Sequence, residues 1–500
     1  MLVKRSDIFQ HIDDHLDEHI AHIQRWVRQP SVSWDNLGVR ECAEVVAASY
    51  RDLGCQEVEI IEGRFHPGVW AYYDAGSPIT IHSYCMFDTR TVQPDGWSHD
   101  PWGAALVPMG PHPKVLVGRG AMGAKGPYVA FLNALKSIIA VEGTLPVNIM
   151  FLAEGEEIMG SPTYRAFVER YRDRLQHVSA SYCATSTQGA NGTVNVGLGL
   201  KGMIVLQLTA SGAAWGHGPT RTIHSSAASL VDSPPFRLAR ALATLTDPDG
   251  RGCAIAGMEE LWSYRKPLSA GERRLLESLA DRAAGKDWRA VLPVGGVDNV
   301  AELNTSLDGI DPLVTFLYGP TLNVAGLWSG FLGPGTTTIP FIVPGTASAM
   351  LDLRLVVEAS PDEVVGLIRA HLDAHGFSDI AIETYAAFSH AQTELSDPGV
   401  QAMLDTLAAW NVAADVWPIQ AGGGPWTAVP NAVGVPCLRG GVIGGGNGGV
   451  TDEYLVIESG NQIAGLADAE KFHVDLLYNY ARSVDATGAI TNAVIAESRV

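Results

Sequence analysis

Charged side chains gather in a few short stretches of this chain, and their types suit acid–base chemistry. Three carboxylates, Glu154, Glu156 and Glu157, stand within four positions, directly after an apolar run. Carboxylates crowded in this way favour a raised pKa in one of them, and therefore a general base. Asp88 follows a second apolar run and is a further acidic candidate.

Cationic side chains supply the complementary chemistry. Arg119 and Lys125 lie in the glycine-rich stretch 118–126, which precedes an amphipathic run. His224 follows a strand-like run and suits an acid or an oxyanion donor. Arg354 lies in another strand-like run, and its planar guanidinium suits a substrate carboxylate. Together these groups predict a site that binds an anion and moves protons.

Each candidate also has a structural interpretation. Asp88 could satisfy turn amides, since short carboxylates often do so, and the glutamates could form a hydrated strand end. Arg119 and Lys125 could be solvated loop charges, His224 a structural histidine, and Arg354 half of an ion pair. The weaker candidates are Asn323, His82, His217 and Cys85. Of these, Cys85 is more consistent with a small buried residue than with a nucleophile.

The elements that must position these groups alternate through the first 190 residues. Strands are predicted at 69–73, 79–84 and 147–152, and helices at 6–27, 41–53, 127–140 and 162–175. This alternation indicates an α/β fold with a mainly parallel mixed sheet and helices on both faces. Active sites of such sheets lie beyond the carboxyl ends of the strands. We therefore expect Asp88 and the three glutamates to converge there.

From Leu200 onward, strand-like runs and predicted helices no longer alternate regularly. We predict a catalytic α/β domain from residues 1–199 and 389–500. Residues 200–388 would form an inserted α+β domain that acts as a lid and a dimerisation surface.

Composition narrows the class of protein. Hydrophobic residues make up 46% of the 500 positions and charged residues 18%, the balance of a soluble globular enzyme. The formal net charge of −20 disfavours nucleic acid and anionic membranes as partners. The six cysteines are scattered, so neither a disulfide framework nor a structural zinc site is expected. No apolar run suggests a membrane span or a secretory signal, and we expect a cytoplasmic protein.

Several motifs resemble the zinc-peptidase family of carnosinase, aminoacylase and succinyl-diaminopimelate desuccinylase. The family's Gly-Arg-Gly-x-x-Asp-Asp-Lys-Gly is similar to GRGAMGAKG at 118–126, and its Glu-Gly-Glu-Glu-Glu-Ile-Gly-Ser to EGEEIMGS at 154–161. His-x-Asp resembles MFD at 86–88, Asp-Leu-His-Ser-Gly resembles TIHSS at 222–226, and Arg-Leu-Val matches 354–356. The resemblance covers nearly the whole chain and implies a zinc-exopeptidase-like fold with a lid domain.

The resemblance also implies roles. Glu157 would be the general base, and His224 would reach across a homodimer interface to stabilise an oxyanion. Arg354 would hold the substrate carboxylate, which makes the ligand an amino-acid-like carboxylate or a small peptide. Lys125 and Asp88 would assist catalysis, and Arg119, Asn323 and Glu156 would contact the substrate.

The family's metal ligands are the one part of the site that the motifs lack. In the family, two zinc ions share a bridging carboxylate and polarise a carbonyl group. The corresponding positions hold residues that are poor ligands for a hard cation: Met86, Gly123, Ile158, Thr185 or Ser186, and Gly449. A one-residue slip could place Glu157 at the third position, but one ligand does not hold two zincs. We therefore predict no catalytic metal and no cofactor.

Three functions remain open for such a site. The first is metal-independent hydrolysis or transfer at an amide bond, with Glu157 as base and Lys125 and His224 as oxyanion donors. The second is cofactor-independent proton transfer at an α-carbon, as in a racemase, epimerase or isomerase. The third is non-catalytic binding of an amino acid or peptide. A dinucleotide fingerprint at 118–123 is disfavoured because it lies far from a first strand.

Overall fold

A computed structural model describes residues 5–93, 95–185, 188–248, 252–263, 266–287, 289, 291–292, 299–303, 308–330 and 341–487. The chain divides into two compact units. Unit 1 comprises Met1–Gly199, Ala391–Pro418 and Ala428–Val500, and unit 2 comprises Leu200–His390 and Ile419–Thr427. Residues Ile419–Thr427 thus belong to unit 2, although the segments on either side of them belong to unit 1.

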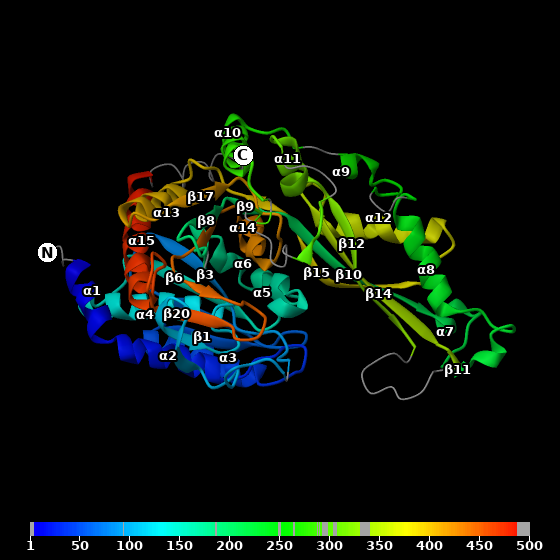
Figure 1. The fold of residues 1–500 in the computed structure, drawn as a ribbon, viewed down its shortest axis with the longest axis horizontal. Helices are drawn as coiled ribbons and strands as arrows, with labels where there is room; N and C mark the ends of the chain where they lie inside the picture. Colours follow the sequence, from blue (N-terminus) through cyan, green and yellow to red (C-terminus); the bar gives the residue numbers. More distant parts are fainter. Residues whose placement is uncertain are drawn as a thin grey trace. The chain divides into compact units, whose positions relative to one another are not determined.

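Unit 1 is built on a six-stranded sheet in the order β1-β2-β6-β3-β7-β18 (Figure 1). Strands β6, β3, β7 and β18 run parallel, and β2 and β1 add antiparallel partners at one edge. The mainly parallel mixed sheet predicted from the sequence is thereby confirmed. The strands are β1 Glu57–Ile61, β2 Gly68–Tyr73, β3 Thr80–Met86, β6 Asn148–Glu154, β7 Ala180–Ala184 and β18 Cys437–Gly440.

The helices of unit 1 form two contacting groups. In one, α4 contacts α1, α2, α3 and α15; in the other, α14 contacts α5 and α6. The helix expected over residues 6–27 is two helices, α1 Arg5–Asp14 and α2 Leu16–Arg28, separated at His15. The others are α3 Val39–Leu53, α4 Lys125–Glu142, α5 Tyr164–Arg170, α6 Arg172–Leu175, α13 Pro398–Ala409, α14 Ala428–Val433 and α15 Leu466–Thr487.

A smaller sheet of unit 1 positions two loops that the sequence patterns did not connect. Its order is β19-β20-β5-β4, with β4 Ala105–Met109, β5 His112–Val117, β19 Gly445–Gly446 and β20 Tyr454–Glu458. Because β5 and β20 pair antiparallel, the stretch after Val117 lies beside the stretch before Tyr454. Two short pairs of strands are also present. β8 Val194–Gly197 pairs in parallel with β17 Ala414–Trp417, and β9 Gly199–Leu200 pairs with β16 Ala391–Gln392.

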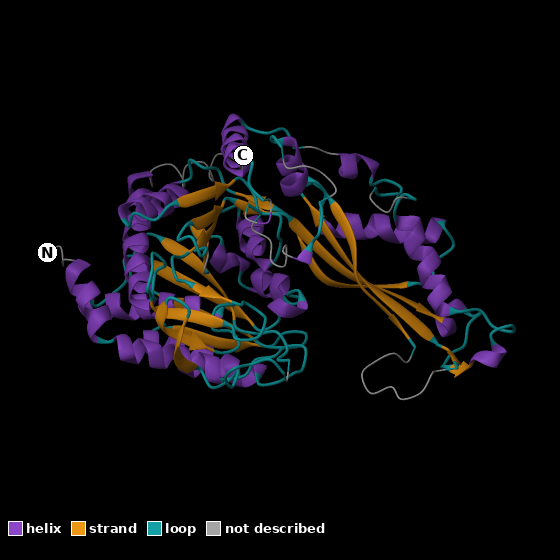
Figure 2. Ribbon diagram, viewed as in Figure 1, coloured by secondary structure: helices purple, strands orange, loops and turns teal. Residues whose placement is uncertain are grey.

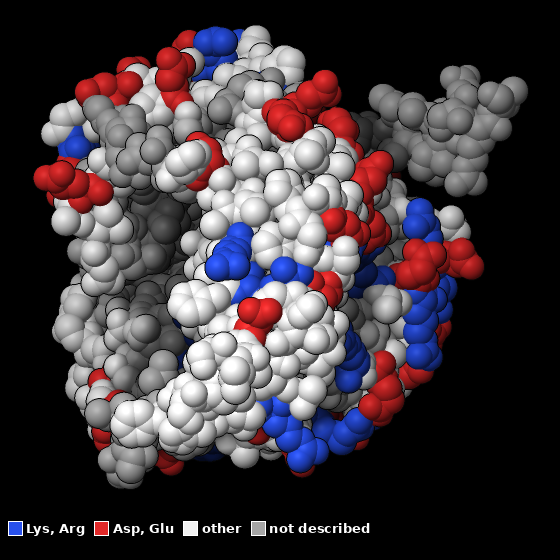
Figure 3. All heavy atoms as spheres, turned by 90° about the vertical axis from the view of Figure 1, so that its right-hand side faces the viewer, with Lys and Arg blue, Asp and Glu red and all other residues white. Residues whose placement is uncertain are grey.

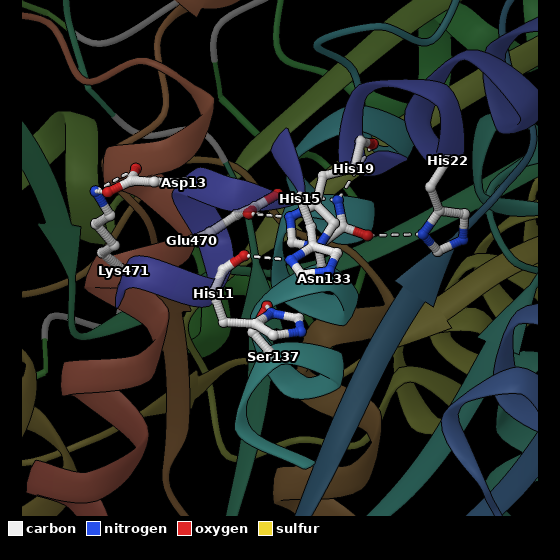
Figure 4. A network of polar contacts seen from close by, with 9 residues as sticks. All are labelled: His11, Asp13, His15, His19, His22, Asn133, Ser137, Glu470 and Lys471. Atoms are coloured by element: carbon white, nitrogen blue, oxygen red, sulfur yellow. Dashed lines mark hydrogen bonds and ion pairs between the residues drawn. The ribbon is translucent and has the colours of Figure 1, made fainter. Parts of the chain in front are cut away.

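Polar contacts join α1 and α2 to α4 and α15 (Figure 4). His19 Nδ1 lies 2.6 Å from Glu470 Oε2, and Asn133 Nδ2 donates to Glu470 Oε1 at 2.9 Å. His22 bonds both Asn133, at 2.7 Å, and Ser49, at 3.0 Å. Burial lowers the pKa of His22 to about 4, so this ring is neutral at physiological pH. The network fixes the N-terminal helices to the body of unit 1.

Unit 2 is an antiparallel sheet in the order β12-β14-β10-β15, with helices α8 and α12 packed against it (Figure 2). Alternating buried side chains of β10 and β14, such as Leu206 and Leu351, form its core with Leu238 and Ile368. Its elements are β10 Gly202–Ser211, α7 Gly212–Trp215, β11 Ile223–His224, α8 Pro234–Leu245, α9 Glu259–Ser263, α10 Ala270–Ala283, α11 Asp311–Tyr318, β12 Thr321–Ser329, β13 Ile342–Val343, β14 Thr346–Leu355, α12 Pro361–Ala374 and β15 Ala381–Phe388.

Two further expectations concern the chain as a whole. The six cysteines are all unpaired thiols. In the part of the chain that the structure describes, every helix is too short or too polar to cross a membrane.

Candidate active site

Asp88 and the acidic stretch meet at the carboxyl end of the main sheet, as the sequence predicts. Asp88 lies two residues beyond β3, and Glu157 begins a short 3₁₀ turn after β6. The backbone N–H groups of Glu157 and Ile158 donate to the Asp88 carboxylate at 3.1 and 2.9 Å, and Ser33 Oγ donates at 2.7 Å. Burial raises the pKa of Asp88 to about 6, against these hydrogen bonds. Asp88 therefore positions the acidic turn.

Glu157 is the acidic residue best suited to act as a base. It is partly buried, and its carboxylate accepts no hydrogen bond from the described residues. Burial, and then the nearby charge of Asp88, raise its pKa to about 7, while Arg90 and Arg439 act in the opposite direction. A carboxylate with that pKa accepts a proton near neutral pH and remains free to contact a ligand.

The other two glutamates serve the local structure. Both carboxylate oxygens of Glu156 are bonded: Oε1 accepts from the backbone of Phe65 and His66, and Oε2 from the backbone and hydroxyl of Thr163. This fully bonded carboxylate favours a loop-fastening role over the substrate contact expected for Glu156. Glu154 accepts from Tyr84 and Ser161, and burial holds its pKa well above the usual value.

Arg119 is buried and paired with a glutamate more than 300 residues away in sequence. Its Nη1 lies 3.0 Å from Glu453 Oε2, and only 2% and 1% of the two side chains are exposed. Glu453 Oε1 also accepts from the backbone of Met122 and Gly123 at 3.0 and 2.6 Å. The Arg119 guanidinium further donates to Val450 O at 3.0 Å. Arg119 thus binds two loops together, and its geometry favours this role over substrate binding.

Lys125 is also engaged in the fold. Its Nζ donates to the backbone carbonyls of Trp26 and Gln29 at 3.0 and 2.7 Å, at the C-terminal end of α2. A cation is favourable there because the carbonyl groups at a helix C-terminus carry partial negative charge. Burial lowers the pKa of Lys125. These contacts favour a helix-capping role over the catalytic role expected from the sequence.

The remaining predicted residues belong to unit 2. The Arg354 guanidinium is bound by Asp352 at 2.8 and 3.1 Å and donates to Gly423 O at 3.1 Å. His224 and Asn323 are both exposed, and His224 Nδ1 lies 2.8 Å from Ser226 Oγ. Arg354 has two donor atoms already committed to Asp352, so a substrate carboxylate would compete with that pair.

Sequence reasoning missed four residues around these groups. Glu453 is the anchor of Arg119, and Lys201 is a buried cation whose Nζ donates to Gly319 O at 2.6 Å. Burial, with the charge of Arg354, lowers the pKa of Lys201 to about 8. Arg90 and Arg439 supply positive charge near Glu157. Local pattern gave no signal for Glu453, whereas Arg90 follows Asp88 so closely that its position beyond β3 could have marked it.

The residues present do not fit a pair of metal ions. The described positions that the motif resemblance matches to the family's metal ligands hold Met86, Gly123, Ile158, Thr185 and Gly449, which offer no carboxylate or imidazole; Ser186 lies outside the described residues. Nor do three His, Cys, Asp or Glu side chains gather elsewhere in the described ranges as a metal site. Of the nearby carboxylates, Asp88 and Glu453 are already bonded to protein donors.

An α/β unit with acidic groups at the carboxyl ends of its parallel strands, joined to an antiparallel unit, defines the class as an exopeptidase-like hydrolase fold. The chain belongs to Peptidase family M20/M25/M40, whose family model matches residues 88–472. The resemblance predicted from the motifs is thereby confirmed for the family.

Named relatives make the class more specific. Beta-Ala-His dipeptidase of Mus musculus is 25% identical over 400 residues, which cover 73% of each chain. Cys-Gly metallodipeptidase dug1 of Schizosaccharomyces pombe is 25% identical over 395 residues, covering 74% of this chain and 76% of that protein. Among solved structures, the M20 family metallo-carboxypeptidase Sso-CP2 of Sulfolobus solfataricus superposes with a TM-score of 0.76 and 25% identity, covering 93% of this chain and 99% of that chain. The chain is therefore a dipeptidase-like member of the family.

Proposed function

We propose that this protein hydrolyses an amide bond in a dipeptide or a related N-acyl amino acid, without a catalytic metal, and that Glu157 is the general base. The observation that carries the proposal is Glu157 itself. Its carboxylate lies at the end of β6, is held in place through its own backbone by Asp88, and accepts no hydrogen bond from the described residues. A carboxylate left free in this position can activate water.

The reaction requires one proton to move twice. Glu157 would take a proton from water as the water oxygen bonds to the substrate carbonyl carbon, and would then give it to the leaving nitrogen as the C–N bond breaks. Metal ions supply several kcal/mol of transition-state stabilisation to such reactions, so about that much must come from protein groups or from a reactive substrate.

The substrate class is inferred from the relatives. Their names assign β-Ala-His and Cys-Gly as dipeptide substrates of those proteins, and we infer a small peptide with a free carboxylate for this chain. We infer that Arg354, which the family motif marks as the carboxylate-binding residue, supplies the cation for that carboxylate.

We also infer a homodimer formed through unit 2. The support is a set of large apolar side chains that this unit leaves exposed; the exposed fractions are 85% for Leu230, 70% for Phe236 and 63% for both Leu327 and Phe341. In the view of Figure 3, uncharged side chains cover much of the surface, with clusters of basic and acidic side chains between them. Sedimentation of the purified protein tests the inference: Leu327→Glu should shift a dimer toward monomer.

Turnover of β-Ala-His and Cys-Gly, followed by NMR in heavy water, tests the function. We expect new amino acids to appear in the presence of a chelator, and Glu157→Gln to reduce the rate about 10²- to 10⁴-fold. Glu59→Gln is the matched control, because Glu59 is an exposed partner of Arg170 in the same unit.

Three results would contradict the proposal. Deuterium exchange at the α-carbon without cleavage would indicate a racemase or isomerase instead. Binding without either reaction would indicate a binding protein. Two tightly held zinc ions in the purified protein, with activity lost to the chelator, would overturn the metal-free part.

A further inference from the structure

Arg90 is the cation near Glu157 whose place in the fold is best defined. The loop that carries it is fastened by its neighbour: Thr89 N donates to Ser31 O at 2.8 Å, and Thr89 pairs with Val32 in a parallel bridge. Strands β3 and β6 are direct parallel neighbours, so Arg90 and Glu157 both follow the carboxyl ends of adjacent strands. The two residues therefore emerge at the same edge of the sheet.

Gly449 makes room for the Arg90 side chain. A β-carbon at Gly449 would lie 3.0 Å from Arg90 Cδ, 3.1 Å from its Nε and 3.2 Å from one of its terminal nitrogens. Gly449 also has a φ of +77°, which favours glycine, and its N–H donates to Glu453 at 3.4 Å. The arginine thus lies along a backbone that is itself held by the Arg119–Glu453 pair.

The Arg90 guanidinium is free to bind a ligand. Within the described ranges it forms no hydrogen bond, ion pair or ring contact, and in particular no ion pair with Glu157. Yet the two charges influence each other, since Arg90 lowers the pKa of Glu157. The base and the cation therefore follow adjacent parallel strands at one edge of the sheet, and they form no ion pair with each other among the described residues.

We propose that the Arg90 guanidinium binds the oxyanion that forms when water, deprotonated by Glu157, adds to the substrate carbonyl carbon. This inference rests on the proposed amide hydrolysis and names the group that would replace a Lewis acid. As the water oxygen bonds to carbon, the π electrons of the carbonyl move onto its oxygen. When the C–N bond breaks, those electrons re-form the carbonyl and the proton held by Glu157 passes to the leaving nitrogen.

Arginine suits this role for two reasons. It stays protonated across the working pH range, and its fork of N–H donors can hold an oxygen anion in a fixed geometry. Preorganised donors aimed at a developing oxyanion each contribute about 10²- to 10³-fold to the rate in enzymes. Arg439 lies near the carboxyl end of β18 in the same sheet. Its positive charge favours the same anion.

The test combines kinetics with binding of a tetrahedral anion. Arg90→Gln should reduce kcat for dipeptide hydrolysis about 10²-fold and change KM little, since the interaction forms in the transition state. The same variant should weaken binding of a phosphinic dipeptide analogue, measured by calorimetry, by a similar factor, and weaken binding of the amino acid products much less. Arg90→Lys should recover part of both losses because it retains the charge.

Two matched variants separate this role from a structural one. Gly449→Ala places a methyl group against Arg90 and should lower phosphinate affinity without removing the arginine. Arg40→Gln removes an exposed arginine of the same unit, paired with Glu62, and should change neither quantity.

The outcomes distinguish this inference from the proposed function. Hydrolysis by the wild-type chain with equal kcat and equal phosphinate affinity in Arg90→Gln would overturn the role of Arg90 and leave the function standing. A wild-type chain that hydrolyses no dipeptide would overturn the function, whereas a loss of phosphinate affinity in Arg90→Gln would still support Arg90 as the anion-binding group.

Discussion

Two arginines and two glutamates occupy neighbouring loops of unit 1, and they differ in how completely their polar atoms are bonded. Arg119 and Glu453 are buried, and each Glu453 oxygen accepts two hydrogen bonds. Arg90 is exposed and Glu157 partly buried, and neither side chain has a hydrogen-bond partner among the described residues. Bonded polar groups hold loops in place, whereas unbonded ones remain available to a ligand. The first pair therefore builds the site and the second can act in it.

The largest effect on stability should come from breaking the buried pair. Glu453→Gln leaves the Arg119 charge buried without a partner, which costs about 3–5 kcal/mol of unfolding free energy in comparable cases. Denaturant unfolding measures the loss. Glu458→Gln is the control, because Glu458 pairs with Lys114 on the surface and exposed pairs contribute only about 0–1 kcal/mol. Equal losses in the two variants would contradict the distinction between buried and exposed pairs.

The second effect is the pH dependence of kcat/KM, which we expect to follow the ionisation of Glu157. Burial and the Asp88 charge raise the pKa of Glu157 to about 7, and a general base must be ionised to act. We expect kcat/KM to rise about tenfold per unit from pH 5 toward pH 7 and to level off above it. A pH–rate profile that is flat between pH 5 and 8 would remove Glu157 as the base.

Much of this arrangement could be predicted from the sequence because it depends on strand ends. The alternation of strands and helices placed Asp88 and the acidic stretch at one edge of the sheet, and the structure brings them within hydrogen-bonding distance. The pairing of Arg354 with Asp352 was also within reach. Residues two apart on a strand point to the same face, so the sequence Asp-Leu-Arg already placed the two side chains together.

The partners of Arg119 and Lys125 could not be predicted in this way. Arg119 pairs with Glu453 because β5 and β20 happen to be sheet neighbours, a contact between segments far apart in the chain. Lys125 reaches the end of α2 through helix packing that periodicity does not specify. The glycine-rich loop therefore suggested anion binding, when both cations had protein partners.

A smaller effect concerns the folding stability that is lost when the unbonded Glu157 carboxylate ionises. The pKa of Glu157 is raised in the folded chain, so its contribution to stability is full below pH 4.5 and is lost as the pH rises through about 7. Glu157→Gln removes that loss, and we expect the variant to be about 1 kcal/mol more stable than wild type at pH 8. Unfolding at pH 4 should show no such gain. A variant less stable at pH 8 would indicate that Glu157 has a structural partner.

The smallest effect tests whether a hydrogen bond to Asp88 influences the pKa of Glu157. Ser33→Ala removes one hydrogen bond to the Asp88 carboxylate and should cost about 1 kcal/mol of stability. Because that bond favours the ionised form, its loss raises the pKa of Asp88 and weakens the negative charge beside Glu157. The midpoint of the pH–rate profile should therefore move to lower pH.

Ser31→Ala is the matched control for this last change. Ser31 Oγ donates to the Phe87 carbonyl at 2.6 Å rather than to a carboxylate, so its loss should cost similar stability and leave the midpoint unchanged. If both variants shift the midpoint equally, the shift reflects a general disturbance of the loop. If neither does, Asp88 positions the acidic turn through its hydrogen bonds alone, and its charge does not influence the base.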